Sequence, residues 1–126
     1  MSERKSIIKD KSFLFTKRII KLYKYLTDSK KAFVLSKQML RSGTAIGALV
    51  REAQNAESRM DFVHKLAIAQ KEYDETIYWL ELLFETDYLS EKEFKSIQKE
   101  ADELLRMIRS SIITTKKVKK KPTHNS

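Results

Sequence analysis

Hydrophobic residues recur at strides of three and four along most of the chain, which is the spacing of one face of an α-helix. The pattern predicts four helices, over about 11–27, 31–56, 59–87 and 90–115. The positions predicted to face a common core are Phe15, Ile19, Leu22, Tyr23 and Leu26 in the first segment, Leu35, Met39, Ser42, Ile46, Leu49 and Ala53 in the second, Phe62, Leu66, Ala69, Tyr73, Thr76, Leu80 and Leu83 in the third, and Phe94, Ile97, Ala101, Leu104, Ile108 and Ser111 in the fourth.

Short connections between long helices favour antiparallel packing of successive helices. The predicted fold is therefore all-α, an up-down-up-down four-helix bundle. We expect three parts: an N-terminal extension over 1–10, the bundle over 11–115 and a disordered basic tail over 116–126.

Capping signals and composition support long helices. Ser90 followed by Glu93 has the spacing of a capping box, and Ser58 with Asp61 approximates one. The 126 residues include two glycines and one proline, which argues against an all-β fold rich in tight turns. Cysteine is absent, so disulfides and thiolate metal sites are excluded.

Nothing in the sequence predicts export or insertion into a membrane. The N-terminus lacks the apolar stretch of a signal peptide, and no run approaches the roughly 18 apolar residues of a membrane span. The expected location is cytoplasmic, with no membrane partner.

Two features suggest close contact between helices. Gly43 and Gly47 lie four residues apart inside the second segment, where each glycine costs about 1 kcal/mol relative to alanine. Close helix packing at this small-residue surface is the usual compensation. The third segment is apolar around more of its circumference than one core requires, which makes it either the most buried helix or part of a subunit interface.

The charge is unevenly distributed. The chain carries a net charge of +9, yet residues 42–115 hold 14 acidic against 9 basic side chains. Positive charge concentrates in residues 1–41 and 116–126, which favours a polyanionic partner such as nucleic acid. The candidate phosphate-contacting residues are Lys17, Arg18, Lys21 and Lys24, opposite the first apolar stripe, and Lys116, Lys117, Lys119, Lys120 and Lys121 in the tail. The alternative is a lysine-rich surface that only maintains solubility.

No catalytic constellation emerges. A di-iron site is not expected, because His64 points away from the core stripe and the second histidine, His124, is in the tail. Acidic residues cluster at Glu72, Asp74 and Glu75, with no nucleophile beside them.

We interpret these polar side chains as structural. Arg41, Glu52 and Glu75 are predicted to link the second and third helices, and loss of one partner would cost a few kcal/mol if the pair is partly buried. We expect no metal, no cofactor and no enzymatic activity.

A set of motifs resembles the signature of a known bacterial family. The motifs are Arg41-Ser42-Gly43-Thr44-Ala45-Ile46-Gly47-Ala48, Arg51-Glu52-Ala53, Asp61-Phe62, Lys65-Leu66, Ala69, Lys71-Glu72, Asp74-Glu75-Thr76 and Tyr78-Trp79-Leu80-Glu81-Leu82-Leu83. They are similar to those of the 23S rRNA intervening-sequence proteins, and the resemblance covers about residues 12–113. It implies a left-handed up-down-up-down bundle that assembles as a ring-like homopentamer. It also implies a distant relationship to the accessory protein of diversity-generating retroelements, a basic pentamer that binds nucleic acid and a reverse transcriptase. No catalytic residue is implied.

The expected function is thus a non-enzymatic, oligomeric helical bundle that binds nucleic acid, RNA or structured DNA, through its basic surface and tail. The expected partners are further copies of itself, nucleic acid and a protein such as a reverse transcriptase. The alternative is an interaction adaptor that docks a partner protein on its acidic or apolar helix surfaces.

Overall fold

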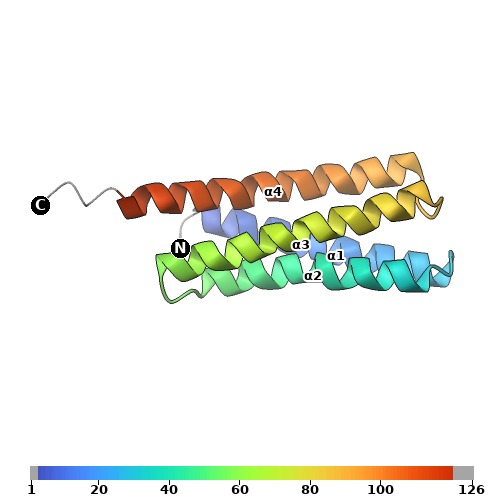
Figure 1. Cartoon of the computed structure of the whole chain (residues 1–126), viewed down its shortest axis with the longest axis horizontal. Helices are drawn as coiled ribbons and strands as arrows, with labels where there is room; N and C mark the ends of the chain where they lie inside the picture. Colours follow the sequence, from blue (N-terminus) through green and yellow to red (C-terminus); the bar gives the residue numbers. More distant parts are fainter. Residues whose placement is uncertain (1–2, 121–126) are drawn as a thin grey trace, which may run out of the picture.

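The computed structural model describes residues 3–120, with side chains for 7–117, and contains four α-helices. They are α1 (Glu3–Asp28), α2 (Phe33–Gln54), α3 (Arg59–Glu85) and α4 (Glu91–Lys120). Figure 1 shows them side by side along one long axis, alternating in direction. Each helix contacts its neighbours in the chain, and α4 returns to α1, so α1 and α3 occupy opposite corners. The predicted all-α, up-down four-helix arrangement is confirmed.

The outer ends of the fold differ from the prediction. Residues 3–10 are the first turns of α1 rather than an extension, because Ile8, at 2% exposure, continues the buried stripe one heptad before Phe15. At the other end, α4 continues to Lys120, so residues 116–120 are helical rather than disordered. Lysine is a good helix former, and its charge is favourable at a helix C-terminus. The rest of the predicted tail, 121–126, lies outside the described residues.

The core is built from the predicted stripes, most closely in the last two helices. All six stripe positions of α4 are buried, as are six of the seven in α3, where Phe62 is half-buried. Polar side chains in this core are paired: the hydroxyls of Ser42 in α2 and Thr76 in α3 are both fully buried and lie 2.9 Å apart. A buried hydroxyl pair of this kind satisfies both groups and fixes the register of the two helices.

The connections between helices do without glycine. After α3, Asp87 adopts a left-handed backbone with φ of 70°, and the Tyr88 N–H donates to the Leu83 carbonyl at 2.8 Å. This is a Schellman-type C-terminus in which aspartate replaces the usual glycine. The α4 start is the predicted capping box, since Ser90 and Glu93 each accept a hydrogen bond from the other's backbone N–H.

Both glycines lie against α1 inside the same subunit. A side chain at Gly43 would place its Cβ 2.9 Å from Cγ2 of the fully buried Ile19, and one at Gly47 would collide with the Thr16 hydroxyl. The glycines therefore let α1 and α2 approach closely. This surface is occupied within the monomer, so it is not available to bring two subunits together.

Candidate nucleic-acid interface

The outward face of α1 carries a row of exposed lysines. Lys17, Lys21 and Lys24 lie on the side away from the core, and none forms an ion pair with a carboxylate in the described part of the chain. The Lys17 ammonium lies 5.8 Å from the centroid of the Phe13 ring. These three side chains can reach a polyanion without breaking an existing salt bridge.

Arg18 is separated from this row by its partners on α4. Its Nη1 lies 2.6 Å from Glu100 Oε1, and its Nη2 donates to the Ser96 hydroxyl at 2.7 Å. The predicted grouping of Arg18 with the three lysines is therefore not found in the structure. The spacing of residues within α1 predicts that Arg18 lies opposite the apolar stripe. It does not reveal that side chains of α4 lie close enough to pair with Arg18.

The basic C-terminal end lies far from the α1 lysine row. Lys116 and Lys117 are exposed on α4, whose last turns lie at the end of the bundle that holds the first turn of α1 (Figure 1). Lys21 lies 18 residues along α1 from Glu3, or about 27 Å at 1.5 Å per residue. The two predicted basic groups are thus separate surfaces. The side chains of Lys119, Lys120 and Lys121 lie outside the described residues.

Another basic surface, which was not predicted from the sequence, lies between α1 and α2. Lys9 and Arg51 border a groove of about 260 Å³ that is also lined by Phe13 and Gly47. Lys9, Phe13 and Lys17 follow at spacings of four, so they share one face of α1. That spacing was readable in the sequence, but the contribution of Arg51 required the pairing of α1 with α2.

The predicted structural network forms as two separate links between α2 and α3. Arg41 Nη2 lies 2.5 Å from Glu75 Oε1 and Nη1 lies 3.7 Å from Glu72, whereas Glu52 pairs with Lys65 at 3.1 Å. The Arg41 and Glu52 side chains are about half exposed, at 54% and 51%. Exposed pairs of this kind contribute about 0.2–1 kcal/mol, so the larger cost expected for a buried pair does not apply.

A further polar link joins α3 to α4. The buried Tyr73 hydroxyl donates to Asp102, and burial together with this hydrogen bond raises the pKa of Tyr73 above its usual range. The tyrosine therefore stays a neutral donor at physiological pH. Periodicity placed Tyr73 in the core but gave no sign of its partner.

The side chains described here do not gather into a metal centre. Over residues 7–117, no three His, Asp or Glu side chains are placed to hold an ion together. Glu72 and Glu75 face Arg41, while Asp74 and His64 are exposed. None of the helices, as far as they are described, is long and apolar enough to cross a membrane.

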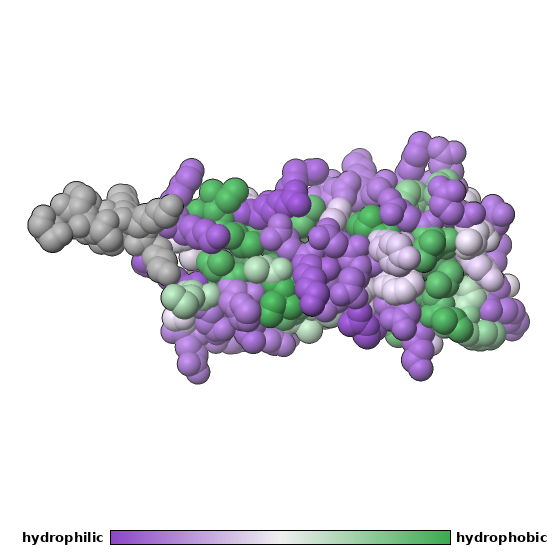
Figure 2. All heavy atoms as spheres, viewed as in Figure 1, coloured by the Kyte–Doolittle hydropathy of each residue, from purple (hydrophilic) through white to green (hydrophobic). Residues whose placement is uncertain are grey.

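Uncovered apolar surface is concentrated on α1 rather than α3. Five large hydrophobic side chains of α1 are exposed: Ile7, Phe13, Leu14, Ile20 and Tyr25. On α3 the exposed large hydrophobic side chains are those of Met60 and Tyr78. Figure 2 shows the α2–α3–α4 side of the bundle, where hydrophilic side chains separate the apolar patches.

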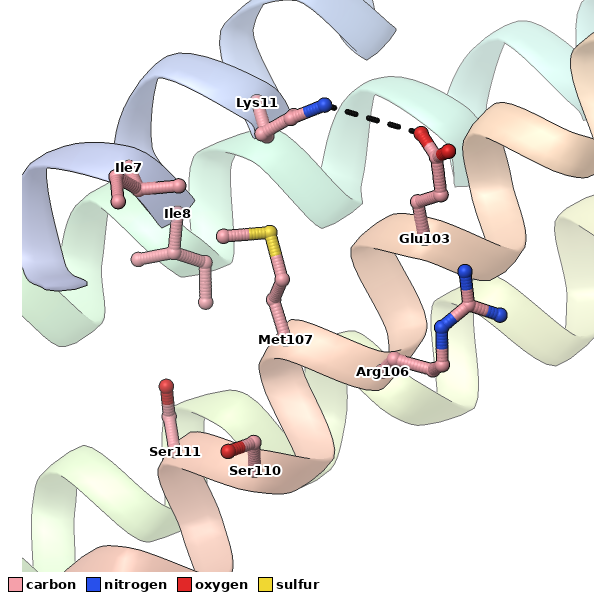
Figure 3. Close-up of a pocket in the computed structure, with 8 residues that line it drawn as sticks. All are labelled: Ile7, Ile8, Lys11, Glu103, Arg106, Met107, Ser110 and Ser111. Atoms are coloured by element: carbon pink, nitrogen blue, oxygen red, sulfur yellow. Dashed lines mark ion pairs between the residues drawn. The ribbon is translucent and has the colours of Figure 1, made fainter.

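An open groove of about 590 Å³ also separates α1 from the C-terminal half of α4. Ile7 and Ile8 approach Met107 across it, and Lys11 pairs with Glu103 at its edge at 3.8 Å (Figure 3). Arg106 lines the same groove. The combination of an apolar floor and a charged rim suits contact with another protein surface.

Comparison with known proteins gives a consistent match. The family described as 23S rRNA-intervening sequence protein matches residues 4–110. The chain is also similar to a crystal structure from Bacteroides thetaiotaomicron, described as a protein with unknown function from the S23 ribosomal protein family. The two chains are 50% identical with a TM-score of 0.85, and the match covers 86% of this chain and 97% of that chain. None of the curated proteins matches in sequence. The function must therefore be argued from the surface of this chain.

Proposed function

We propose that this chain, which belongs to the 23S rRNA-intervening sequence protein family, is a non-enzymatic, oligomeric helical bundle that binds nucleic acid through basic surfaces. The row formed by Lys17, Lys21 and Lys24 is the observation that carries the proposal. Its ammonium groups are exposed on one face of α1 and lack carboxylate partners among the described residues. The basic end of α4, with Lys116 and Lys117 exposed, provides a second contact.

Such a surface favours contacts with phosphates over readout of base sequence. Lysine ammonium groups on flexible stems act as point charges without the rigid fork that recognises a base edge. Phosphate contacts supply affinity and position but carry no sequence information. The proposed binding is therefore largely sequence-independent and is repeated on each subunit, so weak contacts add through multivalency.

Fluorescence anisotropy with labelled RNA, as duplex and as single strand, tests this function over a series of salt concentrations. We expect the logarithm of the affinity to fall linearly with the logarithm of the salt concentration, because binding releases counterions. Absence of binding at low salt would contradict the proposal. Binding that does not respond to salt would instead favour an apolar docking surface, as in an adaptor protein.

The proposal includes assembly into a homopentamer, the state that the family resemblance implies. In a head-to-tail ring, two different patches of each subunit meet. The α1–α4 groove is one such patch, and the outward face of α3 is the other. The exposed residues on that face of α3 are Met60, His64, Ala67, Lys71, Asp74, Tyr78, Glu81 and Glu85. The apolar and acidic side chains of its C-terminal half complement the apolar floor and Arg106 of the groove.

Light scattering after size exclusion at micromolar concentration should give a mass of about 74 kDa, five times the 14.8 kDa of one chain. Ile7→Lys places a charge on the groove and should shift the protein towards monomer. Val34→Lys is the control, because Val34 is an exposed β-branched residue on α2 that does not line the groove. A wild-type mass of 14.8 kDa would rule out the assembly.

A further inference from the structure

The groove between α1 and α2 combines positive charge and an exposed ring in one place. Lys9 and Arg51 reach it from opposite helices, and no carboxylate lines it. Gly47 lines the groove beside Thr16, whose hydroxyl occupies the space where a side chain at position 47 would begin. A neighbouring hollow of about 440 Å³ is lined by Lys9, Phe13 and Arg51 together with Asp10 and Leu14. The two hollows share Lys9, Phe13 and Arg51.

The side chain of Phe13 is largely exposed. Its ring is 55% exposed, whereas Phe15, two residues away, is 1% exposed in the core. Leaving a phenyl ring in water forgoes the stabilisation that its burial would give. The ring is flanked along α1 by Lys9 on one side and Lys17 on the other, each four residues away. An exposed ring between cations is the arrangement by which proteins hold unpaired bases, with stacking on the ring and phosphates at the cations.

We infer that this α1–α2 groove binds single-stranded nucleic acid, with one base stacked on Phe13 and the adjacent phosphates contacted by Lys9 and Arg51. The inference rests on the proposed function and specifies the form of nucleic acid. Bases in a duplex are already stacked and paired, so their faces are not open to the phenyl ring.

The probes are a labelled oligouridylate and an RNA duplex of equal length, used with the full chain. Wild-type protein should bind the single strand more tightly. Phe13→Leu keeps an apolar side chain but removes the ring, and it should weaken single-strand binding by about 5- to 100-fold while leaving duplex binding unchanged. Phe33→Leu is the matched control, since Phe33 is 59% exposed on α2 and does not line the groove, and it should change neither affinity.

A second variant separates stacking from charge. Arg51→Gln should lower the salt slope for the single strand by about 0.7, the value for one phosphate contact. Phe13→Leu should leave that slope unchanged, because the ring releases no counterion. Circular dichroism melts of both variants should match wild type, since both side chains are exposed.

The outcomes distinguish this inference from the proposed function. Equal effects of Phe13→Leu on the single strand and the duplex, or no effect on either, would overturn base stacking while leaving phosphate binding by the bundle intact. Failure of wild-type protein to bind either probe at low salt would overturn the proposed function itself. Loss of single-strand affinity in Phe33→Leu equal to that in Phe13→Leu would also count against the α1–α2 groove.

Discussion

Gly43→Leu is expected to destabilise the bundle by about 1–3 kcal/mol, which corresponds to a fall in melting temperature of roughly 4–15 °C. The new Cβ would lie 2.9 Å from Cγ2 of Ile19, and that side chain is fully buried and has no free space to move into. Relief therefore requires α1 to shift away from α2. The higher helix propensity of leucine, about 0.8 kcal/mol relative to glycine, offsets part of this cost.

Gln38→Leu provides the control for this experiment. Gln38 lies on the same helix but is exposed and lines neither groove of α1, so a leucine there meets solvent rather than α1. Its melting temperature should stay within about 3 °C of wild type, because surface substitutions usually change stability by at most about 0.5 kcal/mol. Equal melting of Gly43→Leu and wild type, measured by circular dichroism, would show that the contact with Ile19 is not tight.

The helix stripes could be predicted from the sequence because one side of each helix must be buried. The prediction was most accurate in α4, where all six expected positions are buried. In α2 it was wrong in detail: Leu35 and Leu49 are only half-buried, while Ser36 and Val50 are fully buried. A strict heptad drifts by about 20° per repeat relative to a straight helix, so positions at the ends of the stripe slip by one residue.

The candidate interface was less accessible to prediction, because it depends on which helices are neighbours. The exposure of Lys17 follows from its place on α1. The ion pair of Arg18 with Glu100 depends on the packing of α1 against α4, and the position of Arg51 beside the groove depends on the packing of α1 against α2. Periodicity fixes the face of a residue within its own helix but not the side chains that reach it from another. The left-handed sense of the bundle and the pentameric assembly stay predictions.

The largest effect on binding is expected from removing the two basic groups together. Replacing Lys17, Lys21 and Lys24 by glutamine should flatten the salt slope for duplex binding by about 2.7, at roughly 0.9 per phosphate contact. Deleting residues 116–126 removes five lysines and should flatten it by about 4.5 if all of them meet phosphates. The groups lie about 25 Å apart along the bundle, as judged from the helix rise. Distant groups without shared partners act independently, so the combined variant should show the sum of the two changes.

The matched control replaces Lys37, Lys92 and Lys99 by glutamine, which removes the same number of charges as the α1 variant at exposed positions on α2 and α4. It should leave the slope near the wild-type value, because a counterion is released only where an ammonium group meets a phosphate. A control slope as flat as that of the α1 variant would mean that overall charge, rather than either surface, governs binding. An unchanged slope after both removals would instead indicate that the phosphates are contacted in the groove between α1 and α2, where Lys9 and Arg51 remain.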